Sequence, residues 1–196
     1  MFSSIQGEGA YAGYPCLFIR LSGCTRNCDF CDTKYHEKGT TIQDEEIEDI
    51  IKKSKSEIVV WTGGEPLLQF ESLKNVIAVT GGTHHLETNG DLLTDRSFRT
   101  TFDYVSCSPK DLKTAKKVFK MHKDVPYRSD IKVVTDGKDL NMDLIPYATS
   151  LMPLSTQDKK ENIKIMQRVW KLCIEKHKIF CLRQHVIVWG LNERGV

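Results

Sequence analysis

The sequence lacks long apolar runs, a marked charge imbalance and low-complexity tracts. Its apolar runs, such as residues 16–19, are far shorter than the roughly 20 residues of a membrane-spanning helix. The N-terminus has neither the basic stretch nor the apolar segment of a secretory signal. The 28 basic and 26 acidic residues leave a net charge of +2, which does not favour nucleic acid. We therefore expect a cytoplasmic protein that binds neither membrane nor nucleic acid.

The composition is that of a globular protein. The 196 residues are 40% hydrophobic and 28% charged, which fits a single domain over residues 1–196. In a reducing compartment the seven cysteines are expected to be metal ligands or core thiols, because disulfides are rare there. Cys16, Cys107, Cys173 and Cys181 occupy apolar segments, so we expect them in the core.

Short apolar runs alternate with segments of helical periodicity. Strands are expected at residues 17–21, 58–61, 84–87, 103–107, 131–134, 148–152 and 179–182, and helices at 41–55, 67–79, 113–121 and 158–177. Such alternation predicts right-handed crossovers and a parallel sheet. We therefore expect an α/β fold, a partial and open (β/α) barrel with about six mainly parallel strands. Ligands would bind at the carboxyl ends of its strands.

Two of these helices carry detailed expectations. Thr41 followed by Asp44 resembles a capping box at the start of the first helix. The helix at 158–177 has an apolar stripe that is predicted to face the core, with any exposed part available for a dimer contact. The stripe consists of Ile163, Met166, Val169, Trp170, Cys173 and Ile174.

Three cysteines follow the first predicted strand directly, with the spacing Cys24-x3-Cys28-x2-Cys31. With His36 as a fourth ligand they could form a structural zinc site. Alternatively, three thiolates could hold an iron–sulfur cluster and leave one iron open to a ligand that is not protein. The location at the mouth of a barrel favours the cluster, since a structural zinc knuckle has no reason to lie there.

Two further segments border the predicted strands. Thr62-Gly63-Gly64-Glu65-Pro66 follows the second strand, where glycines let the backbone approach a ligand and Glu65 could receive an ammonium group. A plain turn before a helix is the other interpretation. Near the N-terminus, Gln6 and Glu8 suit an amide-bearing heterocycle. Arg20 suits a carboxylate, or is a charge at the rim.

Taken together, these motifs resemble a known family. The cysteine spacing is similar to that of the radical S-adenosylmethionine superfamily. Nearly the whole chain resembles the 7-carboxy-7-deazaguanine synthase family (QueE) within it. The resemblance is carried by Ser4-Ile5-Gln6-Gly7-Glu8-Gly9, Phe18-Ile19-Arg20-Leu21, Cys31-Asp32-Thr33, Thr62-Gly63-Gly64-Glu65-Pro66, Glu87-Thr88-Asn89-Gly90, Ser108-Pro109-Lys110, Ile131-Lys132-Val133-Val134 and the tail His185-x3-Trp189-Gly190.

The resemblance implies a radical lyase. Such enzymes contract 6-carboxy-5,6,7,8-tetrahydropterin to 7-carboxy-7-deazaguanine with loss of ammonia, in queuosine-type 7-deazapurine biosynthesis. Their cofactors are a [4Fe-4S] cluster, S-adenosyl-L-methionine and Mg²⁺. An electron donor such as flavodoxin or ferredoxin serves them, and family members are homodimers.

The resemblance also assigns site residues. Cys24, Cys28 and Cys31 would hold the cluster, and Thr33 would bind Mg²⁺. Substrate contacts fall on Ile5, Gln6, Gly7, Glu8, Arg20, Thr62 and His185. Cofactor contacts fall on Phe30, Asp32, Gly64, Glu65, Ser108 and Lys110.

The chain departs from the family at two places. Met152 stands where many relatives have a glutamine, and the pair Arg183-Gln184 does not match the tail of relatives, so their roles stay open. Two other functions compete with the synthase. A glycyl-radical activase would not need Gln6, Glu8, Arg20 and Thr33, and a zinc-stabilised binding module would not be an enzyme.

Overall fold

The computed structural model describes residues 1–29, 31, 38–95, 100–193 and 195. The described residues contain eight strands in one sheet, paired in chain order. The first strand, β1 (Phe2–Ile5), runs antiparallel to β2 (Pro15–Leu21). The others are parallel: β3 (Ile58–Gly63), β4 (Thr83–Thr88), β5 (Tyr104–Cys107), β6 (Ser129–Thr135), β7 (Ser150–Pro153) and β8 (Ile179–Phe180).

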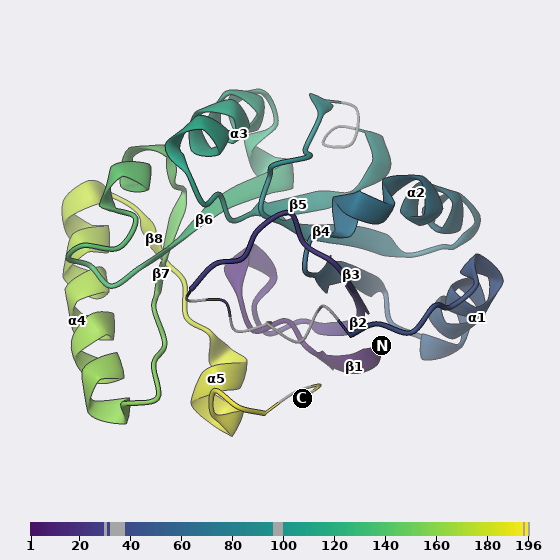
Figure 1. Cartoon of the computed structure of the whole chain (residues 1–196), viewed down its shortest axis with the longest axis horizontal. Helices are drawn as coiled ribbons and strands as arrows, with labels where there is room; N and C mark the ends of the chain where they lie inside the picture. Colours follow the sequence, from purple (N-terminus) through teal and green to yellow (C-terminus); the bar gives the residue numbers. More distant parts are fainter. Residues whose placement is uncertain (30, 32–37, 96–99, 194, 196) are drawn as a thin grey trace.

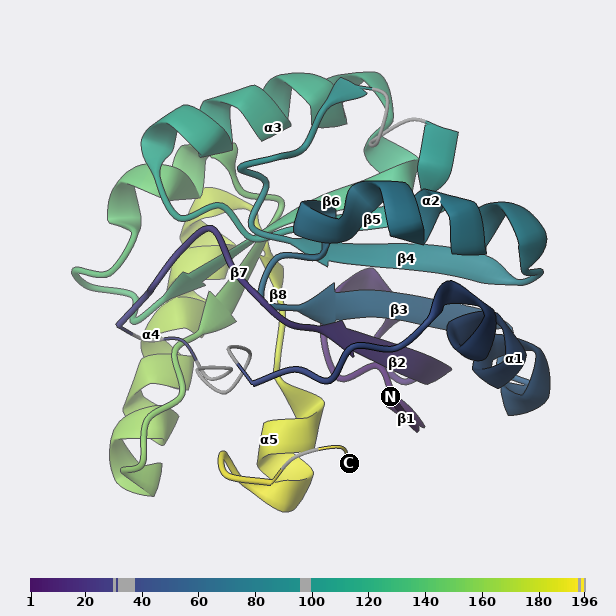
Figure 2. The same cartoon turned by 45° about the vertical axis from the view of Figure 1, so that its right-hand side comes forward.

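The long helices pack on the outer, convex face of this curved sheet (Figures 1 and 2). They are α1 (Asp44–Ser54), α2 (Phe70–Val79), α3 (Leu112–Asp124) and α4 (Lys159–Lys176). The helix α5 (Gln184–Trp189) follows β8, near the strand β1 at the other end of the sheet (Figure 1). The sheet order gives no pairing of β8 with β1, so the barrel is open. The predicted α/β partial barrel is therefore confirmed, with eight strands in place of about six.

Two apolar clusters hold the helices to the sheet. The larger joins β2–β6 to α1, α2 and α3 around Trp61, Leu86 and Ile131. The smaller joins β6 and β7 to α3 and α4 around Leu151 and Val169. A third, small cluster of Cys16, Ile58 and Val60 packs on the other face of β2 and β3, against Tyr11 and Phe18. Farther along the strands, at their carboxyl ends, this concave face carries polar side chains such as Arg20, Glu87 and Lys132. Among the described residues, no helix is long and apolar enough to cross a membrane.

The detailed expectations for two helices are corrected. Helix α1 begins at Asp44, and its N-cap is Gln43, whose side chain makes no capping hydrogen bond; the capping box from Thr41 is wrong. Three acidic residues in its first turn favour the helix start through the helix dipole instead.

The buried face of α4 also differs from the prediction. It consists of Ile165, Val169, Leu172 and Cys173, whereas Ile163, Trp170 and Ile174 are exposed. The helix carries two apolar stripes that share Val169 and Cys173, and packing against β7 selected the other one. The four thiols expected in the core, Cys16, Cys107, Cys173 and Cys181, are buried as predicted.

Candidate functional site

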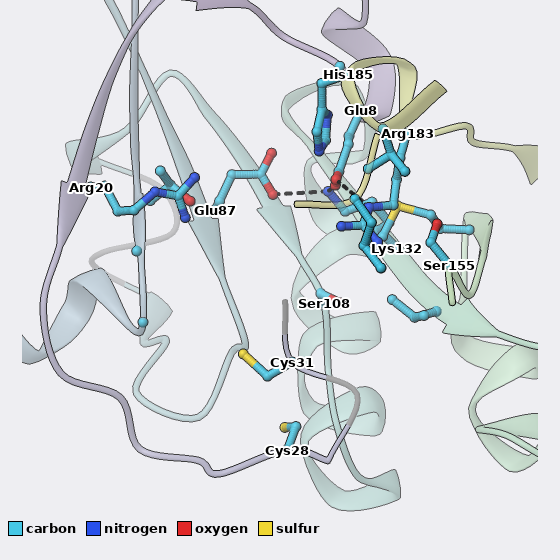
Figure 3. Close-up of a pocket in the computed structure, with 18 of the residues that line it drawn as sticks. Glu8, Arg20, Cys28, Cys31, Glu87, Ser108, Lys132, Ser155, Arg183 and His185 are labelled. Carbon is cyan, nitrogen blue, oxygen red and sulfur yellow. Dashed lines mark hydrogen bonds and ion pairs between the residues drawn. The ribbon is translucent and has the colours of Figure 1, made fainter. Parts of the chain in front are cut away.

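A cavity of about 830 Å³ opens on the concave side of the sheet, at the carboxyl ends of the parallel strands. Its wall takes Arg20 from β2, Thr62 from β3, Glu87 from β4 and Lys132 from β6. The loop after β1 and the segment after β8 complete it. The sheet topology therefore gathers residues from the whole length of the chain around one space, as Figure 3 shows.

All three cysteines of the triplet lie outside disulfide bonds and line this cavity. Burial raises the pKa of the Cys28 thiol, and the ammonium group of Lys110 nearby opposes that rise. Among the described residues, no three His, Cys, Asp or Glu side chains lie close enough together to hold a metal ion. The three thiols share one wall of the cavity without converging on one point. As sulfur donors on one loop they suit an iron–sulfur cluster, whose bonds to the thiolates would bring them together.

The loop that carries these cysteines is fastened by Arg26. Its guanidinium pairs with both Asp91 and Asp111, with Arg26 Nε 2.6 Å from Asp91 Oδ2. The hydroxyl of Thr25 donates to the same Asp91 carboxylate at 2.8 Å. The Asn89 side chain in turn donates to Thr25 at 2.9 Å. These contacts hold the cysteine loop against the ends of β4 and α3.

The glycine turn after β3 packs directly on the cysteine loop. A Cβ at Gly64 would lie 1.9 Å from the Gly23 carbonyl oxygen and 3.0 Å from Cys24 Cβ. The Glu65 amide donates to the same Gly23 carbonyl at 2.8 Å. Glycine is therefore required here by close approach of two backbones, next to the first cysteine.

Glu65 does not line the cavity. Its side chain is fully buried, and its carboxylate accepts hydrogen bonds from the Thr88 hydroxyl and from the amides of Leu67 and Asn89. Burial raises the pKa of Glu65, and these hydrogen bonds oppose the rise. The Glu65 carboxylate therefore joins the ends of β3 and β4. It does not face the cavity, where the expected contact with an ammonium group would have to form.

A cluster of charges lies at the other end of the cavity from the cysteines (Figure 3). Lys132 Nζ lies 2.6 Å from Glu8 Oε2 and 3.1 Å from Glu87 Oε2. Arg183 Nε lies 3.5 Å from Glu8 Oε1. Burial by itself would raise the pKa of Glu8, but Lys132 and Arg183 lower it to about 2. Burial raises the pKa of Glu87, and repulsion from Glu8 adds to that rise although Lys132 opposes it.

The N-terminal loop joins this cluster to the C-terminal segment. The Gln6 side chain donates to Glu87 Oε1 at 3.3 Å, and the Gln184 amide donates to the Gly7 carbonyl at 2.9 Å. A Cβ at Gly7 would lie 2.4 Å from Nδ1 of His185, so only glycine lets that imidazole approach. Residues from the two ends of the chain therefore form one wall.

The structure brings most of the predicted residues together. The cavity is lined by Ile5, Gln6, Gly7, Glu8, Arg20, Cys24, Cys28, Cys31, Thr62, Gly64, Ser108, Lys110 and His185. Ser108 and Lys110 contact each other, with the Lys110 ammonium donating to the hydroxyl at 2.8 Å. Phe30, Asp32, Thr33 and the zinc candidate His36 lie outside the described residues.

Two central residues of the site, Glu87 and Lys132, were not among those expected from the sequence. Each is a charged residue inside a strand whose neighbours are buried: Leu86 and Thr88 beside Glu87, and Ile131 and Val133 beside Lys132. A single charge in a buried strand needs a partner, which is a usable signal in the sequence. It does not reveal that the two are partners of each other.

Comparisons with known proteins agree with this geometry. Residues 18–134 match the model of the radical SAM superfamily. The chain is 34% identical over 188 residues to a 7-carboxy-7-deazaguanine synthase of Bacteroides thetaiotaomicron, covering 93% of this chain and 96% of the relative. It is 32% identical to the enzyme of that name from Clostridium acetobutylicum, covering 100% and 96%. QueE from Escherichia coli has a similar fold, with a TM-score of 0.69 at 21% identity over 94% and 92% of the two chains.

Proposed function

Because the chain belongs to the radical SAM superfamily and, within it, to the 7-carboxy-7-deazaguanine synthase family, we propose that it is such a synthase. It would convert 6-carboxy-5,6,7,8-tetrahydropterin to 7-carboxy-7-deazaguanine and ammonia. One observation supports this most strongly: the cysteine triplet and the cluster of Glu8, Glu87 and Lys132 face the same cavity. A radical source and a polar site for a heterocycle are both needed for this reaction.

Cys24, Cys28 and Cys31 are the residues that would hold a [4Fe-4S] cluster. Together with S-adenosylmethionine, the bound cluster supplies the radical that starts the reaction. Gly64 and Cys24 lie side by side on the cavity wall, where the cofactor's amino acid portion would bind. Ser108 and Lys110 suit a ribose hydroxyl and a carboxylate. Phe30 and Asp32 complete the proposed cofactor contacts. Glu65 contributes indirectly, because its carboxylate joins the ends of β3 and β4 beside Gly64.

The substrate would occupy the opposite half of the cavity. Arg20, which lies 5.9 Å from the centre of the Phe2 ring, can pair with the carboxylate of a carboxypterin. Gln6, Glu8 and Thr62 offer hydrogen-bond partners for the N–H and C=O groups of its ring, beside the backbone of Ile5 and Gly7. Thr33 is proposed as an oxygen ligand of Mg²⁺, since that cation prefers oxygen to the neighbouring thiols.

Loss of ammonia requires a group that delivers protons to nitrogen. Glu87 fits this task because its pKa is raised and it lines the cavity. Nearby Glu8, with its pKa of about 2, stays ionised and accepts hydrogen bonds. Two carboxyl groups whose environments separate their pKa values commonly divide the acid and acceptor roles in this way. His185, on the same wall, offers a second group for proton transfer.

Partners and location belong to the same proposal. We propose a homodimer that uses the exposed apolar face of α4, and a small redox protein such as flavodoxin or ferredoxin as electron donor. The free cysteines agree with a reducing cytoplasm. The product would enter 7-deazapurine biosynthesis.

The test is reconstitution of the chain with iron and sulfide under anaerobic conditions. About four irons per chain are expected. Incubation with 6-carboxytetrahydropterin, S-adenosylmethionine and a reductant should yield 7-carboxy-7-deazaguanine, identified by mass. Tight zinc binding without the iron–sulfur absorbance would refute the proposal.

A second experiment tests the substrate assignment. Glu8→Gln and Arg20→Ala should each lower turnover of the pterin, while cleavage of S-adenosylmethionine without substrate continues. Unchanged pterin turnover in both variants would point to a different substrate, such as the protein partner of a glycyl-radical activase.

A further inference from the structure

Lys132 is the central cation of the cavity wall, and no role was assigned to it above. It lies on β6 with only 3% of its side chain exposed. Its ammonium group bridges Glu8, from the loop after β1, and Glu87, from β4 (Figure 3). Lys132 is thus the contact through which two carboxylates from distant parts of the chain are held on one wall.

A buried lysine is costly unless it is well paired, because the charge leaves water. Here three carboxylates surround the ammonium group. Burial alone would lower the pKa of Lys132, but Glu8, Glu87 and Asp130 raise it well above its usual value. The ammonium group is therefore held in its charged form by the carboxylates around it. A permanent charge at a fixed point is suited to orienting other groups.

The two carboxylates need such an orienting group. Glu8 forms ion pairs with two cations, Lys132 and Arg183. Among the described residues, Glu87 forms an ion pair with Lys132 alone. The other contact of Glu87 is the neutral Gln6 amide at 3.3 Å. Without Lys132, Glu87 would face Glu8 and Asp130 as buried like charges, and repulsion would turn it away or neutralise it.

We propose that Lys132 is a positioning residue that fixes the Glu8 and Glu87 carboxyl groups relative to each other, so that Glu8 accepts from the N–H groups of a bound pterin and Glu87 faces the nitrogen that is released. The proposal rests on the proposed function, since the ligand is the pterin of that reaction. The N–H groups of a pterin need an ionised acceptor, and the nitrogen that is released needs a proton donor at a defined distance from it. Lys132 sets that distance by bonding Oε2 of both carboxyl groups.

Other titratable groups also face Lys132, and their charges enter any pH dependence. They are Asp130 on β6, Tyr104 on β5 and Cys181 after β8. Arg183 and His185, at the start of α5, act on the neighbouring Glu8. None of them lies within ion-pair distance of the Lys132 ammonium in the described structure, where Glu8 and Glu87 do.

Lys132→Arg is the decisive variant because it keeps the charge and changes the geometry. A guanidinium in this buried place cannot put one donor point between both carboxylates as the ammonium does. We expect affinity for 6-carboxypterin, the unreactive oxidised probe, to fall about 10- to 100-fold, the usual effect of losing an orienting partner. KM for the tetrahydropterin should rise, while substrate-free cleavage of S-adenosylmethionine stays at the wild-type rate.

Lys132→Met removes the charge as well. The pH at which 6-carboxypterin binding is lost on the acid side should then move upward, because Glu8 loses its strongest cation. Lys178→Met is the matched control. It removes a lysine that donates to the Ala148 carbonyl outside the cavity, and it should bind the probe like the wild type. Thermal unfolding of all variants separates lost binding from lost folding.

The outcomes distinguish the two proposals. If the wild type neither binds 6-carboxypterin nor converts the tetrahydropterin, the proposed function fails. If the wild type is active and Lys132→Arg matches it in affinity, KM and pH profile, Lys132 supplies charge alone and the positioning role is refuted. Should Lys132→Met fail to fold, the Lys132→Arg result still decides.

Discussion

At the scale of single residues, the cavity depends on glycines, which have no side chain, as well as on its functional side chains. The turn after β3 touches the turn after β2 so closely that a Cβ at Gly64 would overlap the Gly23 carbonyl. Such an overlap moves the backbone that carries Cys24. The position of one glycine is therefore linked to the geometry of the cysteines proposed as cluster ligands.

Gly64→Ala should destabilise the protein by about 1–3 kcal/mol, the usual cost of overpacking. It should also lower the iron retained after reconstitution. Chemical denaturation and iron analysis check both effects. Gly81→Ala is the matched control: a Cβ there meets nothing within 4 Å, so stability should stay within about 0.5 kcal/mol. Equal behaviour of the two variants would contradict the packing argument.

A second prediction for a single residue concerns His85. Its imidazole is buried against Tyr11 and Tyr104, and burial lowers its pKa from 6.5 to about 4. In the unfolded chain it takes up a proton near pH 6.5, so the unfolded state binds more protons between these two pH values. The free energy of unfolding therefore falls as pH drops through that window, by on the order of 3 kcal/mol.

His85→Phe keeps a ring in place and removes the titration. Relative to the wild type, the variant should gain most of that free energy on going from about pH 7.5 to about pH 4.5. Urea unfolding at the two pH values measures the change. Parallel pH dependence of the two proteins would show that His85 is not held neutral.

At the scale of elements, α4 has two apolar faces. Ile165, Val169 and Leu172 pack against the sheet, while Ile163, Trp170 and Ile174 remain exposed. Exposed apolar side chains that gather along one helix face commonly mark an interaction surface. This face supports the proposed homodimer.

Replacing Ile163 and Ile174 together by glutamate should convert the proposed dimer into a monomer, since charges cannot be buried without partners. Light scattering during gel filtration gives the mass. The control is Lys171→Glu, a change to negative charge at an exposed residue of the same helix outside the apolar stripe. A dimer that survives the double substitution uses another surface.

At the scale of the whole molecule, the two ends of the chain close one site. The Gln184 amide bonds the Gly7 carbonyl, and the Gly9 amide donates to the Cys181 sulfur at 3.1 Å. These contacts place the N-terminal loop across the gap that the open barrel leaves. The extent of the domain, residues 1–196, stays a prediction.

The cysteine loop lies at the mouth of this fold, and Cys24, Cys28 and Cys31 belong to none of the apolar clusters. Cys28→Ala should therefore abolish turnover and reduce bound iron, while the unfolding free energy of the iron-free protein changes by no more than about 0.5 kcal/mol. Cys107→Ala is the control, because this thiol is fully buried. This variant should retain the iron, and its free energy of unfolding should fall by about 1 kcal/mol. Global unfolding of Cys28→Ala would make the site structural.

The sequence by itself determined the features that depend on neighbouring residues. Alternating periodicities indicated each parallel strand from β2 to β8. The spacing of the three cysteines and the glycine turn after β3 indicated the family and its cofactors. These signals are local because one loop supplies all three thiols and one turn supplies both glycines.

Only the tertiary structure decided what depends on contacts between distant segments. It paired Lys132 with Glu8 and Glu87, turned Glu65 inward and chose which apolar stripe of α4 to bury. It also added β1 and α5, whose short segments carry no strong periodicity. The physical reason is common to all of these. A buried charge or an apolar stripe shows that a partner is needed, but the partner is selected by the way the sheet brings remote strands together.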